Sequence, residues 1–289
     1  MKRVIKLQLV GAVAIATLLA ACDVKDPIYN TPHPEHGKIT LTTEWDGIGE
    51  GLQAPDSYTV CIGDYTTNVS GSTNTLDHLF APGTYRMLIY NTPENISFDG
   101  TVADAMNGDT HDPGWLFSYS AEVTISKDTD HAFTAVMKQQ LRELTLVIEP
   151  TGDAADRIES IKGYLNAIAG KFDMENETYL FPIMLMFDFS KIADGPDAGK
   201  WSSTIRTLGF MPEESKGLSL KIHYKDGNPE MQIVTSDLTE ALAGFNDDKR
   251  TPLTLGGSVV DTPTGAGFGA IIDDWTAGNG DGEDIDANM

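Results

Sequence analysis

The sequence predicts an all-β protein with two antiparallel β-sandwich domains and one short helix in the second. The main observation is a series of short runs in which apolar and polar side chains alternate with a period of two, separated by turns rich in glycine and proline. Such alternation is typical of antiparallel sheets that pack on one face only. Behind an N-terminal leader, the chain is long enough for two domains of ordinary size.

Residues 1–21 have the features of an export signal. Lys2, Arg3 and Lys6 form a positive head, and an uncharged, largely apolar run follows at 7–19. This run is shorter than the roughly 20 residues that a helix needs to cross a bilayer. We therefore expect the segment to be removed after export rather than kept as a membrane span.

Cys22 follows two alanines directly, and residues 19–22 resemble the bacterial lipobox. That resemblance implies that the thiol takes a diacylglycerol group and that Cys22 becomes the acylated first residue, with palmitate-type chains holding the protein to the outer membrane. Cys22 is thus the expected lipid attachment site. The alternative is an ordinary export signal followed by a chance cysteine, which leaves the small residues beside the cysteine unexplained.

The mature chain is strongly acidic. Without residues 1–21 it has 17 lysines and arginines against 43 aspartates and glutamates, a formal charge of −26. Such a surface repels phosphate backbones, which argues against nucleic acid as a partner, and it disfavours docking on anionic lipid. If Cys22 is acylated, Cys61 has no disulfide partner, and we interpret it as a small buried residue rather than a reactive nucleophile.

We interpret residues 22–37 as a tether, because they contain three prolines and few apolar side chains. His33, Glu35 and His36 raise the alternative of a metal site in this segment. A proline-rich loop lacks the rigid element that a pair of metal ligands needs, so we expect no metal there.

Residues 38–138 form the first predicted domain. In the first run, Ile39, Leu41 and Thr43 share one face of a strand. The runs with this alternation are 38–45, 57–63, 83–91, 121–126 and 131–138.

Residues 139–289 form the second predicted domain, and we expect its core to be separate, beyond a short connection near 138–142. A strand is predicted at 144–148, followed by a crossing or short helical turn at 154–163. The strongest strand signal is at 181–189, where five apolar side chains alternate and the other face carries two methionines and one aspartate. Because that other face is only partly polar, we expect it to be covered.

A hairpin and a helix complete the second domain. Residues 218–224 and 231–235 flank an Asp-Gly turn. Asp237 and Glu240 have the spacing of a capping box, and Gly244 provides a stop, so the predicted helix lies here. The acidic run 279–286 carries oxygen ligands suited to calcium, but it lacks the spacing of a calcium loop and is expected to be a solvated terminus.

Four segments resemble the fimbrillin and fimbrial-anchor proteins of Bacteroidales. They are "LFAPGTYRMLIYN" (79–91), "LRELTLVIEP" (141–150), "SIKGYLNAIAGKFDM" (160–174) and the C-terminal 267–289. Each motif is moderately specific, and their order along the chain carries the resemblance, which covers most of 22–289. It implies transthyretin-like sandwich domains and a role at the cell surface in a fimbria.

The resemblance also narrows the role. Shaft subunits of this family are cut after an arginine near the end of the first strand, which frees a groove for the donor strand of the next subunit. Here no arginine lies between Cys22 and Arg86, and Arg86 falls within a predicted central strand, although a protease might accept Lys38. The resemblance therefore implies an anchor subunit that keeps its lipid and binds shaft subunits by donor-strand pairing; a shaft or tip subunit is the alternative.

Two other classes of function compete with a fimbrial role. The sequence has no nucleophile elbow, zinc-protease motif or phosphate-binding loop, so we expect neither catalysis nor a cofactor. Trp45, Trp115 and Trp201 offer aromatic side chains for a sugar platform, which leaves a surface glycan-binding lipoprotein as the rival interpretation.

Overall fold

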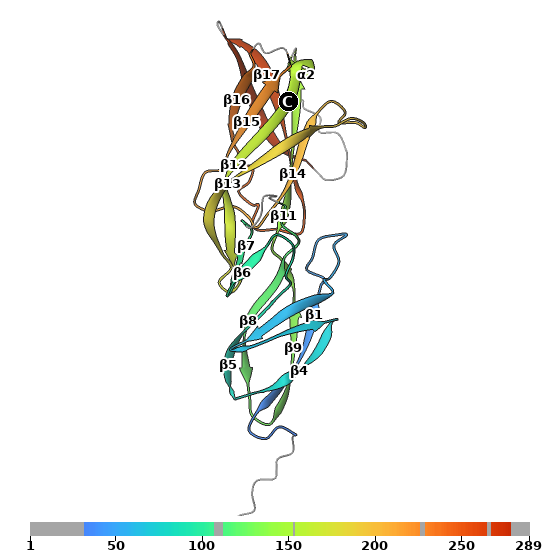
Figure 1. Cartoon of the computed structure of the whole chain (residues 1–289), viewed down its shortest axis with the longest axis vertical. Helices are drawn as coiled ribbons and strands as arrows, with labels where there is room; N and C mark the ends of the chain where they lie inside the picture. Colours follow the sequence, from blue (N-terminus) through green and yellow to red (C-terminus); the bar gives the residue numbers. More distant parts are fainter. Residues whose placement is uncertain (1–31, 107–111, 153, 226–228, 265–266, 279–289) are drawn as a thin grey trace, which may run out of the picture.

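The computed structural model describes residues 32–106, 112–152, 154–225, 229–264 and 267–278; for 260–274 and 276–278 the backbone alone is described. The molecule is elongated, with the two halves of the chain arranged end to end (Figure 1). Nearly all regular structure is β-strand, and the helix among the described residues is a single turn, α2 (Ala154–Arg157). The predicted all-β class is confirmed.

The first half is a sandwich of a three-stranded sheet, ordered β4-β1-β9, and a five-stranded sheet, ordered β10-β8-β5-β2-β3. The short strands β6 and β7 lie at its upper end (Figure 1). The strands of this half are β1 (Gly37–Glu44), β2 (Ser57–Ile62), β3 (Tyr65–Ser70), β4 (Thr73–Phe80), β5 (Gly83–Tyr90), β6 (Ser97–Asp99), β7 (Val102–Asp104), β8 (Phe117–Ile125), β9 (Thr129–Val136) and β10 (Lys138–Gln139).

The predicted apolar faces of the first half point into one core. Ile39 and Leu41 of β1 are fully buried, as are Val60 of β2 and Ile89 of β5. Because successive side chains of a strand point to opposite faces, this burial fixes the register of each strand against the core.

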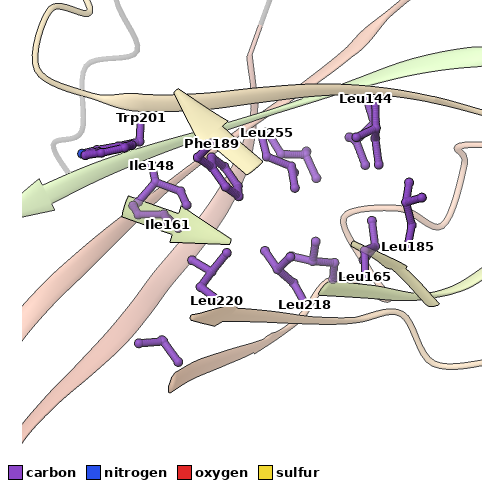
Figure 2. Packing of buried hydrophobic residues seen from close by; sticks show 14 of the residues in the cluster. Leu144, Ile148, Ile161, Leu165, Leu185, Phe189, Trp201, Leu218, Leu220 and Leu255 are labelled. Carbon is purple, nitrogen blue, oxygen red and sulfur yellow. The ribbon is translucent and has the colours of Figure 1, made fainter. Parts of the chain in front are cut away.

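The second half has one long, strongly curved series of strands, ordered β16-β15-β12-β13-β14-β11-β17-β18. Their inward faces surround a second core, in which Phe189 and leucine side chains from several strands lie around one shared interior (Figure 2). The strands are β11 (Arg142–Thr151), β12 (Ile158–Asp173), β13 (Thr178–Lys191), β14 (Trp201–Thr207), β15 (Gly217–Tyr224), β16 (Met231–Asp237), β17 (Leu253–Thr264) and β18 (Gly267–Gly278).

Both halves begin with the same pairing. β1 lies between β4, to which it is antiparallel, and β9, to which it is parallel. In the second half, β11 lies between antiparallel β14 and parallel β17. Two parallel strands need a long crossover between them, and here the rest of each half supplies it. The expected repetition of one sandwich class is thus visible in strand order, with one parallel pair in each half.

The prediction of a crossing or short helical turn at 154–163 is wrong for residues 158–163, which belong to a strand. After α2 the chain enters β12, a 16-residue strand that pairs with both β13 and β15. Ala167 and Phe181 have positive φ angles of 57° and 60°, and a register shift between β12 and β13 falls at 165–168. A bulge changes which side chains face the core, so simple alternation fails in this stretch.

The predicted helix after Asp237 is also misplaced. Residues 239–247 form successive turns, in which only the bond from Leu242 N to Leu238 O (2.9 Å) has α-helical spacing among the described hydrogen bonds. Asp237 does act at the start of the segment, because its Oδ1 accepts a hydrogen bond from Thr239 N (2.9 Å). Among the described residues of this half, the short helix is α2 instead.

Each half has a core of its own, and the two halves also share a joint. β6 and β7 form a hairpin, and β7 then pairs antiparallel with β12 of the second half. A third apolar cluster contains Leu88 and Leu116 from the first half and Phe172 and Leu208 from the second. In the described part of the chain the other strands pair within their own half if β10 is counted with the first, since Gln139 pairs with Phe117 of β8. The predicted boundary at 138/139 falls inside this two-residue strand and remains a proposal.

Candidate anchoring and assembly site

The first strand is held as a central element of its sheet. Ile39 and Leu41 are fully buried, and Thr43, which is also buried, bonds through its hydroxyl to Tyr58 Oη (3.1 Å). With hydrogen-bonded neighbours on both sides, β1 fills the position that would become a groove if it were removed. Lys38 is half-buried within the same strand.

Arg86 lies in the middle of the five-stranded sheet, as the sequence predicts. β5 pairs with β2 on one side and with β8 on the other, and Arg86 is directly opposite Glu122 of β8. Its Nε donates to Glu175 Oε1 (3.0 Å) in the second half. A chain break at Arg86 would therefore divide a central strand and remove a contact between the halves.

Residues 33–36 fasten the start of the folded chain to the β8–β9 turn. His33 is buried, its Nε2 lies 2.9 Å from Asp130 Oδ1, and its Nδ1 lies 3.0 Å from His36 O. Glu35 N donates to Asp128 Oδ1 (2.9 Å), and Asp128 N donates to His36 O (2.8 Å). The hydrogen bond to Asp130 is the largest cause that raises the pKa of His33. We call His33 and Asp130 the latch.

The latch was not predicted, and neither residue carries a sequence signal for it. Cys22, the expected lipid attachment site, lies outside the described residues, as does the acidic run 279–286. In the described part of the chain, no group of three or more His, Cys, Asp or Glu side chains is placed to hold a metal ion. No helix among those residues is long and apolar enough to cross a membrane.

A half-buried lysine lies at the joint between the halves. Lys249 Nζ lies 4.6 Å from the ring centre of Phe172 and 4.9 Å from that of Tyr179. It donates to Gln140 O (3.0 Å) in the connection between the halves. Burial lowers the pKa of Lys249 to about 7 and raises the pKa of Tyr179 to about 12, while Glu177 opposes the change at the lysine.

Lys249 belongs to the loop at 245–251, which also contacts the start of the second half. Arg142 donates from Nε to Thr251 O (2.6 Å) and from Nη1 to Phe245 O (2.9 Å). Burial lowers the pKa of Arg142, although the guanidinium remains charged. These bonds attach residues 245–251 to β11 beside the connection.

A cleft of about 800 Å³ lies next to this loop, lined by side chains that include Trp115, Glu143 and Arg250. The guanidinium of Arg206 lies 5.0 Å from the ring centre of Trp115 and covers one ring face. Cys61, expected to be buried, is half-buried in β2.

The other two candidate tryptophans do not join Trp115. Trp45 packs edge-on against Tyr58 and Phe117, with ring centres 5.9 and 5.7 Å away. Trp201 is buried in the second core. The three residues therefore do not form one sugar platform.

The sequence model of one protein family, the fimbrillin-A associated anchor proteins Mfa1 and Mfa2, matches residues 62–279. The chain belongs to this family. The resemblance read from the sequence is thereby confirmed, and the protein is a fimbrial anchor or adhesion protein. No curated protein matches the chain.

Solved structures show the same fold at low sequence identity. The fimbrial anchor protein Mfa2 from Porphyromonas gingivalis is 12% identical, with a TM-score of 0.57 over 84% of this chain and 97% of that chain. A candidate adhesin from Bacteroides ovatus is 17% identical, with a TM-score of 0.57 over 84% of this chain and 93% of that one. A second, from Bacteroides thetaiotaomicron, is 14% identical, with a TM-score of 0.55 over 86% and 99%.

Proposed function

We propose that this protein is the base subunit of a fimbria, held in the outer membrane by lipid on Cys22 and acting by binding rather than by catalysis. The observation that carries the proposal is the retained first strand. β1 is central and buried, and the nearest arginine beyond Cys22 is Arg86, inside another central strand. A processing step of the shaft-subunit type has no arginine to use at β1.

Retention of β1 has two consequences in this proposal. The tether stays continuous from Cys22 to the fold, so the acyl chains keep the protein on the membrane. Each buried methylene contributes about 0.8 kcal/mol, and two or three chains therefore anchor firmly. The position of β1 also stays occupied, so the first half does not accept a donor strand there, and growth of the fimbria ends at this subunit.

We place the contact with the shaft at a sheet edge. An added strand completes a ladder through main-chain hydrogen bonds, while its alternate side chains supply specificity. β16 and β18 are the two ends of the second-half strand series. They approach each other without pairing as a ladder, linked by the bond from Trp275 Nε1 to Ser236 Oγ (2.8 Å). This seam supports donor-strand pairing with a shaft subunit.

The test compares the two cysteines in the native cell. Cys22→Ala should release the protein from membranes and shed fimbriae into the medium, often longer than normal, whereas the matched control Cys61→Ala should leave both in place. Mass spectrometry of the native N-terminus should find acylated Cys22. Partitioning of Cys22→Ala with membranes after a salt wash would contradict the proposal.

Deletion of the gene separates the remaining alternatives. Fimbriae that are made but shed support the base subunit. Loss of all fimbriae would identify a shaft component instead. Unchanged fimbriation together with binding to a panel of soluble glycans would favour the glycan-binding lipoprotein.

A further inference from the structure

The outer face of β12, β13, β15 and β16 carries large apolar side chains that the described chain leaves exposed. Figure 1 shows these four strands in the upper half of the molecule. Met184, Met186 and Ile233 expose 66%, 52% and 61% of their surface, while the opposite face of the same strands lines the second core. The expectation that the outer face of β13 is covered is therefore wrong for the described residues.

Strand register makes these side chains neighbours. Met186 is opposite Tyr164, and Tyr164 is opposite Ser219. One row further along, Ile233 is opposite Lys221, and Lys221 is opposite Lys162. Directly paired residues share a face of the sheet, so the side chains form one continuous surface. We call it the outer patch: Tyr164, Met184, Met186, Lys221, Met231 and Ile233.

A groove of about 250 Å³ crosses the patch between Tyr164, Ser219, Lys221, Met231 and Ile233. Contiguous exposed apolar surface marks interaction sites, because scattered apolar residues are common on protein surfaces but clustered ones are not. Methionine is well suited to such a surface, since its unbranched side chain adapts to different partners.

The charge of the patch identifies the kind of partner. The whole chain has a formal net charge of −23, yet the centre of this face presents two lysines and one aspartate. Lys162 pairs with Asp188 (2.6 Å), which leaves Lys221, a lining residue of the groove, without an ion pair to any described residue. An exposed cation among apolar side chains is complemented by a carboxylate that is itself flanked by apolar groups.

We propose that the outer patch docks a second, acidic subunit of the fimbria, whose apolar side chains cover Met184, Met186 and Ile233 and whose carboxylate pairs with Lys221. This inference rests on the proposed function. The patch includes two residues of β16, an edge strand at the seam, so one partner can contact both the edge and the face. A symmetric pair of this chain fits less well, because a two-fold contact brings two copies of the same face together, and each copy has two lysines and one aspartate and so the same net positive charge.

The test measures binding of the purified shaft fimbrillin of the same bacterium to the mature chain. Met186→Asp combined with Ile233→Asp should weaken binding by about tenfold or more, the usual effect of losing central apolar anchors. Lys221→Glu should weaken it as well, and Lys221→Arg should not. The matched control is Val136→Asp, at a side chain of β9 that is 45% exposed and lies in the other half.

Circular dichroism and thermal melts verify that each variant is folded. Unchanged binding by the folded double variant overturns the proposal. Sedimentation equilibrium tests the other occupant: a wild-type dimer that the double variant loses would assign the patch to a second copy and also overturn it.

In cells, the double variant should stay on the membrane while fimbriae detach. The proposed function is tested separately with Cys22→Ala. It fails if this variant is not released from membranes.

Discussion

His33 and Asp130 are 97 positions apart in the sequence, yet His33 Nε2 lies 2.9 Å from Asp130 Oδ1. The histidine side chain is 1% exposed and the aspartate side chain 74% exposed, so the contact closes over the ring from the solvent side. It attaches the last residues of the tether to the start of β9. The end of the tether is thus part of the fold, although its composition resembles that of a free linker.

The latch should depend on pH. Because the hydrogen bond to Asp130 raises the pKa of His33, protonation of the ring favours the folded state. The stability it contributes is complete below the ordinary histidine pKa of about 6.5 and is lost as pH rises through the folded pKa. Asp130→Asn should lower the pKa of His33 in an NMR titration and speed proteolysis within 32–36 at acidic pH. His36→Ala, at an exposed ring, is the control; equal effects of both changes would contradict the latch.

The burial of β1 predicts a large cost when its core side chains are shortened. Leu41→Ala should lower the free energy of unfolding in urea by about 2–5 kcal/mol, because it removes buried methylenes and leaves a cavity. Thr42→Ala on the outward face of the same strand should cost much less. A small effect of Leu41→Ala would indicate that the fold tolerates the loss of β1, as a processed shaft subunit must.

The lowered pKa of Lys249 predicts a pH dependence of stability at the joint that is opposite in direction to that of the latch. Its pKa falls to about 7 in the folded chain, so the unfolded state binds more protons between that value and the ordinary 10.5. The contribution of this group to stability therefore rises with pH across that window and is least favourable at and below pH 7. Lys249→Met should have a free energy of unfolding several kcal/mol higher than that of the wild type at pH 6, and the difference should shrink toward pH 10. Denaturant titrations at both pH values measure this, with Lys191→Met at an exposed side chain as the matched control.

The sequence predicts the first half better than the second, for a physical reason. β1 alternates without interruption, and β2 and β5 bury three residues in a row, yet the predicted inward residues Ile39, Val60 and Ile89 all reach the core. β12 cannot be read in this way, because a left-handed residue at Ala167 and a register shift change the phase of burial along the strand. Local patterns do not report such irregularities.

The site was predicted only in part. The absence of an arginine near β1 and the central position of Arg86 follow from sequence and resemblance, and the structure places both strands as expected. The latch and Lys249 were not predictable, because each depends on a contact with residues about a hundred positions away. The exposed outer patch was misread for a related reason, since sequence shows that a face is apolar but not whether another element covers it.

In the role proposed above, the parallel pairing of β1 with β9 determines how the molecule carries tension between the membrane and the fimbria. The ladder runs from Gly37 opposite Thr129 to Glu44 opposite Val136. A pull from the membrane enters β1 at Gly37, while a pull from the far half enters β9 at Val136, from which the chain continues into β10 and β11. The two forces act in opposite directions along parallel strands and load the cross-strand hydrogen bonds in shear, together rather than one after another. Forced opening is governed by the unfolding rate, and shear requires many bonds to fail at once. In the proposed anchor, the strand that a shaft subunit would lose is the strand that would resist detachment.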